Sequence, residues 1–113
     1  MVTKFSFATK TGMQPSNPNK KNQDAYITSP HVLGLRHCHF FSVCDGHGLY
    51  GREVSDLLKH RLPFLVENQL KADMKDHDLN LYPSKELIYE SIREAFVLAN
   101  KEVNTILPDV RFR

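Results

Sequence analysis

A short apolar run that ends in an acidic, glycine-flanked turn constrains this chain more than any other feature. The run Phe40–Cys44 has the length and composition of a buried strand, and it leads directly into Asp45-Gly46-His47-Gly48. A buried strand fixes the position of the residue that follows it, while the two glycines permit a tight turn. A fixed carboxylate beside a histidine, which titrates near neutral pH, suits a hard metal ion and a proton-transfer group.

A second carboxylate upstream is the candidate partner of Asp45. A lone carboxylate holds Mg²⁺ or Mn²⁺ poorly, because these ions take about six oxygen ligands. Asp24 opens another strand-like run, Ala25–Thr28, and two neighbouring strands would bring the two aspartates into one site. An aspartate at a strand boundary is also a common turn former that bonds its own backbone, so spacing alone leaves both interpretations open.

The letters NQDA at 22–25, followed about twenty residues later by FSVCDGHG at 41–48, resemble the opening of the metal-dependent protein serine/threonine phosphatases of type 2C. The resemblance runs from about Phe5 to Ile106 and therefore covers nearly the whole chain. It implies an α+β fold: part of the type 2C β-sandwich, with strands first and then two long flanking helices. It also implies hydrolysis of phosphoserine and phosphothreonine in proteins, by a water molecule that two metal ions activate.

The resemblance assigns a role to each matched residue. Asp24 and Asp45 match carboxylates that bind the two Mg²⁺ or Mn²⁺ ions, and Asp45 matches the one that bridges them. The backbone carbonyl of Gly46 matches a carbonyl that faces a metal. His47 matches the histidine proposed as the general acid, which would protonate the leaving alkoxide.

One position clearly departs from the common family pattern, and a second carries a residue that also occurs in one branch of the family. Gln23 stands where many members have glutamate. Asn19 stands where many members place a phosphate-binding arginine, so Lys21 becomes the candidate phosphate-binding residue, with Lys20 beside it. A lysine supplies a point charge and cannot reproduce the bidentate fork of a guanidinium.

The same resemblance predicts that residues 1–113 are the N-terminal segment of a longer catalytic domain. The later Asp-Gly and Asp-Asn motifs of the family, which carry further metal ligands, have no counterpart here. We therefore expect this chain alone to be inactive and to expose apolar surface that a partner or further chain covers. The alternative is a non-catalytic phosphatase-like module that acts as a binding or structural subunit.

Composition narrows the functional classes. The formal charge of +2 is too small and too scattered to favour nucleic-acid binding. Two cysteines and no signal-like start predict reduced thiols and a cytoplasmic or nuclear location. No apolar run approaches the roughly 20 residues that span a membrane, so no membrane insertion is expected. Cys44 is expected inside a strand, which argues against a cysteine phosphatase.

Hydrophobic patterning predicts three strands. They are Lys4–Thr9, Asp24–Ser29 and His39–Cys44, and a turn around Pro30–Gly34 joins the last two.

Two helices are expected after the strands. The first runs from Leu49 to about Leu62, where Pro63 should kink or interrupt it before a further turn or two to Leu70. Ser84 should cap the second, Pro108 should end it, and its apolar stripe should pack on the sheet. That stripe contains Ile88, Ile92, Ala95, Phe96, Ala99, Val103 and Ile106.

Two other metal sites are weaker alternatives. His37, Cys38 and His39 have the composition of a zinc site but lack the ligand spacing that lets a turn wrap the ion. Asp76 and Asp78 imitate the start of a calcium loop, but the later glycine and glutamate of such a loop are absent.

Overall fold

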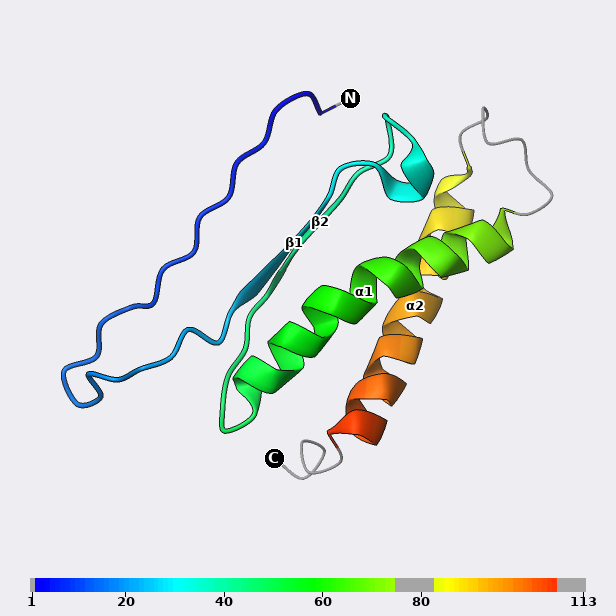
Figure 1. Cartoon of the computed structure of the whole chain (residues 1–113). Helices are drawn as coiled ribbons and strands as arrows, with labels where there is room; N and C mark the ends of the chain where they lie inside the picture. Colours follow the sequence, from blue (N-terminus) through cyan, green and yellow to red (C-terminus); the bar gives the residue numbers. More distant parts are fainter. Residues whose placement is uncertain (1, 75–82, 108–113) are drawn as a thin grey trace.

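The chain forms an antiparallel β-hairpin followed by two long helices (Figure 1), and the computed structural model describes residues 2–74 and 83–107 of it. The hairpin strands are β1 (Ala25–Ser29) and β2 (Phe40–Cys44), and a short 3-10 helix, η1 (Val32–Gly34), lies in the turn between them. The helices are α1 (Gly51–Asp73) and α2 (Lys85–Ile106). The predicted α+β class and the two hairpin strands are therefore confirmed, the strands to within one residue at each end.

The register of the hairpin sorts its side chains onto two faces. Ala25 pairs with Cys44 and Tyr26 with Val43, so alternate residues point to opposite sides. Ala25 and Ile27 are buried on the face that meets α1. The other face presents Tyr26, Phe41 and Val43, and Val43 is 75% exposed.

The strand predicted at Lys4–Thr9 is wrong: residues 2–24 contain no strand. This N-terminal strap (residues 2–9) runs along the hairpin (Figure 1) and meets it through aromatic side chains instead of ladder hydrogen bonds. The Phe7 ring stacks on Tyr26 with centroids 4.2 Å apart, and the Phe5 ring lies 5.0 Å from Phe41. The strand-like alternation of this segment therefore has another cause: the segment lies on the face of the hairpin and does not pair with its edge.

Pro63 does not interrupt α1, which corrects the expected break. The helix continues through Pro63 to Asp73, three residues beyond the expected end at Leu70. A proline inside a helix removes one backbone hydrogen bond and costs about 3 kcal/mol. Leu62 and Val66, on either side of it, are each only 2% exposed, so core packing on both sides of the proline offsets that cost.

Ser84 caps α2 as predicted, because its hydroxyl accepts a hydrogen bond from the Leu87 backbone N–H at 3.2 Å. The buried stripe of α2 is made of small residues and differs from the predicted one. Phe96 and Ile106 are exposed, whereas a serine that the apolar pattern omits is fully buried. The buried residues are Ser91, Ala95, Ala99 and Val103.

The stripe packs chiefly along α1, which corrects the expected packing on the sheet. Two side-chain links show that the helices are antiparallel. Arg61 donates two hydrogen bonds of 2.8 Å to the Glu102 carboxylate, and the Ser91 hydroxyl donates to Asp73 Oδ2 at 2.6 Å. The order of layers is therefore strap, hairpin, α1 and α2 (Figure 1).

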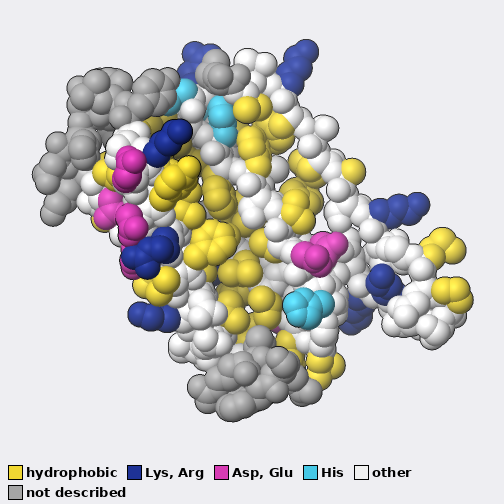
Figure 2. All heavy atoms as spheres, turned by 180° about the vertical axis from the view of Figure 1, so that it is seen from behind, with side chains coloured by type: hydrophobic (Ala, Val, Ile, Leu, Met, Phe, Trp, Pro, Cys, Tyr) yellow, Lys and Arg dark blue, Asp and Glu magenta, His cyan; other side chains and the backbone are white. Residues whose placement is uncertain are grey.

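One hydrophobic core lies where α1 meets the hairpin and α2. Ile27, Val32, Leu62, Leu65, Val66, Leu70, Met74, Ala95 and Ala99 form it. Apolar surface remains outside this core, and Figure 2 shows hydrophobic side chains gathered at the centre of one face. A second sheet, which a β-sandwich requires, is not present in the described residues. Neither described helix is both long and apolar enough to cross a membrane.

Candidate functional site

The hairpin register brings Asp24 and Asp45 to the same end of the sheet. Each is the residue next to the terminal pair Ala25 and Cys44, so the two aspartates extend the ladder at neighbouring positions. The Gly46 backbone N–H donates to Asp24 Oδ1 at 3.3 Å, which places the Asp24 carboxylate against the turn that follows β2. Both aspartates are exposed to solvent.

Asn22 shapes the approach to Asp24. Its Oδ1 accepts a hydrogen bond from the Asp24 backbone N–H at 3.0 Å, which closes a local turn just before β1. Its Nδ2 donates to the Thr9 hydroxyl at 2.7 Å. One side chain thus links the first aspartate to the N-terminal strap.

The turn after β2 depends on glycine at two positions that face each other. A Cβ on Gly46 would lie 2.2 Å from the Gln23 carbonyl oxygen and 2.6 Å from the Gly51 carbonyl oxygen. A Cβ on Gly51 would lie 2.8 Å from Gln23 Oε1. The start of α1, the segment before β1 and the turn therefore pack at backbone distance, and only glycine fits between them.

Gln23 holds this turn through its amide. Its Nε2 donates to the Gly48 carbonyl at 2.8 Å, and Gly48 has a positive φ of 77° that favours glycine. The hydroxyl of Ser55, a residue only 1% exposed, donates to the Gln23 carbonyl at 2.6 Å. A glutamate in place of Gln23 could not make the first bond when ionised, because a carboxylate has no donor.

Arg52 is a site residue that the sequence analysis missed. Its guanidinium donates to the backbone carbonyls of Asn22 and Asp24 at 3.0 and 3.1 Å, and it pairs with Asp56 at 3.0 Å. It therefore fixes the segment that carries Asp24 from the first turn of α1. The available signal was an arginine four residues before an aspartate in the turn after Asp-Gly-His-Gly.

The side chains of Asp45, His47 and Lys21 have no partner among the residues that the structure describes. In residues 2–74 and 83–107, none of the three makes a side-chain hydrogen bond or an ion pair, and all three are exposed. The Asp45 carboxylate is therefore available to a ligand. Whether His47 protonates a leaving group, and whether Lys21 binds phosphate, stay predictions.

The donor set at this end of the hairpin suits a hard divalent cation only in part. Two exposed carboxylates and a backbone carbonyl, those of Asp24, Asp45 and Gly46, are oxygen ligands of the kind Mg²⁺ and Mn²⁺ prefer. Within the described residues, no three histidine, cysteine, aspartate or glutamate side chains are close enough together to hold a metal ion. At most, therefore, these described residues offer part of a coordination shell.

The structure argues against the zinc alternative and does not describe the calcium-loop alternative. His39 is engaged by backbone groups, because its Nδ1 lies 2.7 Å from the Pro30 carbonyl oxygen and its Nε2 accepts from the Val2 backbone N–H at 3.2 Å. Burial raises the pKa of the Cys38 thiol, which disfavours the thiolate that zinc requires. The calcium-loop candidates, Asp76 and Asp78, lie outside the described residues.

Cys44 is a structural thiol at the end of β2. Burial raises its pKa above the ordinary value, and it packs against the core on the inner face of the hairpin. A nucleophilic cysteine needs the opposite, a lowered pKa and access to substrate.

Comparison with known proteins bears on this site. Over 100 residues, which are 88% of this chain, the sequence is 32% identical to "Probable protein phosphatase 2C 35" of Arabidopsis thaliana. The match supports a type 2C-like family. The chain spans about a quarter of the length of this relative, since the matched residues are 25% of it. No protein-family model matches the chain, and no solved structure matches it with significance.

Proposed function

We propose that this chain is the N-terminal part of a metal-dependent protein serine/threonine phosphatase. The observation that carries the proposal is the juxtaposition of Asp24 and Asp45 at one end of the hairpin, with the Gly46 N–H bonded to the first carboxylate. The type 2C relative supports the same function. The substrates would be phosphoserine and phosphothreonine residues of proteins, and the location would be cytoplasmic or nuclear.

Asp24, Asp45 and the Gly46 carbonyl would hold part of a site for two Mg²⁺ or Mn²⁺ ions. The two metal ions, when bound, would supply an activated water molecule and neutralise charge on the phosphoryl oxygens. The chain's own residues position these ligands. Arg52 fixes the backbone beside Asp24, and Gln23 fixes the turn that carries the second aspartate.

His47 would act on the leaving group. It lies between the two glycines of the turn, exposed and without a hydrogen bond or ion pair in the described residues, so its imidazole is free to meet a substrate oxygen. A serine or threonine alkoxide is a poor leaving group, and a proton donated by the imidazolium form of the ring would assist its departure. Lys21 would attract the phosphate as a point charge.

One observation favours the alternative, a non-catalytic phosphatase-like module. The described residues contain no group of three side chains that could hold a metal ion, so this segment by itself would bind metal weakly. The activity would therefore require further ligands from the remaining length that the relative has and the match does not cover.

A metal titration tests the proposal. We expect Mn²⁺, followed by calorimetry or by paramagnetic broadening of amide signals, to bind the wild-type chain weakly and to bind Asp45→Asn at least about tenfold more weakly. Glu53→Gln, which removes one carboxylate from the exposed side of α1, is the matched control and should bind as the wild type does. Equal Mn²⁺ affinity of wild type and Asp45→Asn would contradict the metal assignment.

A full-length protein carrying this segment tests the chemistry. Asp45→Asn should abolish hydrolysis of a phosphothreonine peptide, whereas His47→Ala should lower turnover and leave Mn²⁺ affinity unchanged. An Asp45→Asn protein with wild-type turnover would favour the non-catalytic alternative for this segment.

A further inference from the structure

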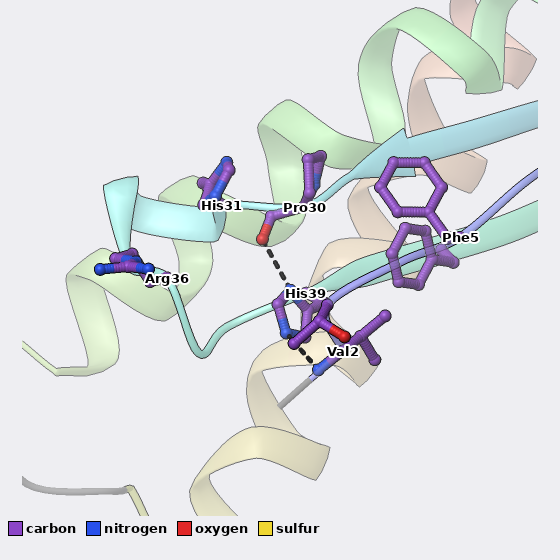
Figure 3. A pocket seen from close by; sticks show the side chains of 8 residues that line it. Val2, Phe5, Pro30, His31, Arg36 and His39 are labelled. Carbon is purple, nitrogen blue, oxygen red and sulfur yellow. Dashed lines mark hydrogen bonds between the residues drawn. The ribbon is translucent and has the colours of Figure 1, made fainter.

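The end of the hairpin away from Asp24 and Asp45 carries a surface pocket of about 290 Å³ (Figure 3). The turn after β1 supplies His31 and Arg36 at one end of it, and the N-terminal strap supplies Phe5 at the other. Phe41 of β2 completes the apolar wall. The pocket thus joins a cationic end to an aromatic end.

His39 forms a fixed wall of this pocket and is not itself available to a ligand. A carbonyl oxygen can only accept and a backbone amide can only donate, so the bonds to Pro30 and Val2 require a neutral ring with its proton on Nδ1. Both ring nitrogens are therefore occupied (Figure 3). The two bonds also hold the strap against the turn, which closes one side of the pocket before any ligand arrives.

The two other basic side chains of the pocket have unused hydrogen-bonding capacity. In residues 2–74 and 83–107, neither the Arg36 nor the His31 side chain makes a hydrogen bond or an ion pair, and no acidic side chain lines the pocket. The guanidinium is charged at every physiological pH and presents a planar fork of donors, and His31 offers a further N–H in either tautomer. Such a fork matches the oxygens of a phosphate monoester.

We propose that this pocket binds the phosphate of a second phosphoserine or phosphothreonine on a peptide substrate, apart from the phosphate that is hydrolysed. Arg36 and His31 would hold the phosphoryl oxygens, while Phe5 and Phe41 would receive an apolar side chain next to the phosphoresidue. The aromatic wall is what favours a peptide over free phosphate, which has no apolar part. This inference rests on the proposed function, because it assigns the pocket to the same class of substrate.

The geometry sets a minimum spacing between the two phosphates. From His39 to Asp45 the chain advances six residues along β2, which at about 3.4 Å per residue is about 20 Å. An extended peptide rises by the same amount per residue. Two phosphoresidues must therefore be separated by at least about six positions to reach both ends of the hairpin at once.

The first test concerns the pocket alone and needs neither metal nor turnover. The isotope-labelled chain is titrated with a singly phosphorylated threonine peptide, its unphosphorylated form and inorganic phosphate, while NMR follows the Arg36 side chain and the Phe41 amide. We expect saturable shifts with the phosphopeptide, about tenfold weaker binding of Arg36→Gln, and wild-type binding of the charge-matched control Arg93→Gln. Wild-type affinity in Arg36→Gln, or inorganic phosphate binding as tightly as the phosphopeptide, would overturn the proposal.

The second test separates this proposal from the proposed function. Doubly phosphorylated peptides with spacings of three and eight residues are compared in the presence of Mn²⁺. If both ends bind phosphate, the longer spacing should bind about tenfold or more tightly, since the second contact becomes intramolecular. If the two peptides bind with equal affinity and Arg36→Gln weakens both, the result would support the pocket and count against phosphate binding at Asp24 and Asp45. Equal affinities without Arg36 dependence would refute the pocket.

Discussion

Gly46→Ala should destabilise the protein more than any other glycine-to-alanine substitution in the turn after β2. The added Cβ would lie 2.2 Å from the Gln23 carbonyl oxygen and 2.6 Å from that of Gly51. Real Cβ atoms essentially never approach other atoms closer than 3.0 Å, and both neighbours are backbone atoms that no rotamer change can move. The segment before β1 and the start of α1 must therefore both move away from the turn. Overpacking of this kind costs about 1–3 kcal/mol, and two backbone contacts argue for the upper end, about 3 kcal/mol.

Two other glycines provide matched controls for this substitution. At Gly12 the nearest atom to an added Cβ is the flexible Lys20 Nζ at 3.6 Å, so Gly12→Ala should be nearly neutral. At Gly48 the space is open but φ is 77°, so Gly48→Ala should lose about 1–2 kcal/mol through backbone strain alone. The expected order of loss is Gly46→Ala, then Gly48→Ala, then Gly12→Ala.

Urea unfolding followed by far-ultraviolet circular dichroism measures these differences. For a chain of this size a loss of about 3 kcal/mol corresponds to a drop in Tm of about 10 °C, which thermal unfolding would show independently. A Gly46→Ala protein as stable as Gly12→Ala would refute the close backbone packing of Gln23, Gly46 and Gly51.

Three further predictions follow from individual contacts. Gln23→Glu should lose about 1–2 kcal/mol at neutral pH, because an ionised carboxylate would face the Gly48 carbonyl, and urea unfolding should show part of that loss regained in acid, where the carboxyl can donate. The hydrogen bond from Arg61 lowers the pKa of the Glu102 carboxyl below its ordinary 4.5. The stability advantage of wild type over Glu102→Gln should therefore be complete above about pH 4.5 and vanish as the pH falls through that lowered pKa. Urea unfolding of both proteins over this pH range measures the difference, and a difference that does not change with pH would contradict the prediction. Burial raises the pKa of the Cys44 thiol above 9.0, so its alkylation by iodoacetamide at neutral pH should be slower than that of a free cysteine peptide, and a faster reaction would show an accessible thiolate.

Local patterns predicted the elements whose stability depends on their own residues. The two hairpin strands were found from short runs bounded by turn formers, and the start of α2 was found from Ser84, whose hydroxyl caps the helix. The side chains of these segments carry the information for their local structure.

Elements that depend on distant neighbours were predicted less well. The alternation of Lys4–Thr9 matches a strand, but strand pairing requires a free edge in register, and aromatic contacts across the face of the hairpin were available instead. Pro63 carries a local signal to break the helix, and packing of Leu62 and Val66 in the core outweighs it. The buried Ser91 was missed because its partner, Asp73, is on another helix.

Within the site, too, features set by local sequence were predicted and features set by distant contacts were not. Asp24 and Asp45 could be placed together from the sequence because both lie at strand boundaries and one register brings such residues side by side. The supporting contacts of Gln23 and Arg52 could not, because they join segments about thirty residues apart along the chain. The roles of His47 and Lys21 stay predictions.

Helix α1 is long enough to link the turn beside Asp45 to the contacts with α2 at its other end. Its 23 residues span about 34 Å, from Gly51 against the aspartate-bearing turn to Asp73, which accepts the hydrogen bond of Ser91 on α2. A straight helix transmits a tilt at one end to the other, so substitutions at the interface of the two helices would reposition the turn as well as weaken the core. Pro63 is the place where this transmission can fail, because the helical ladder lacks one donor there, and amide exchange should divide the helix into two cooperative segments at that residue.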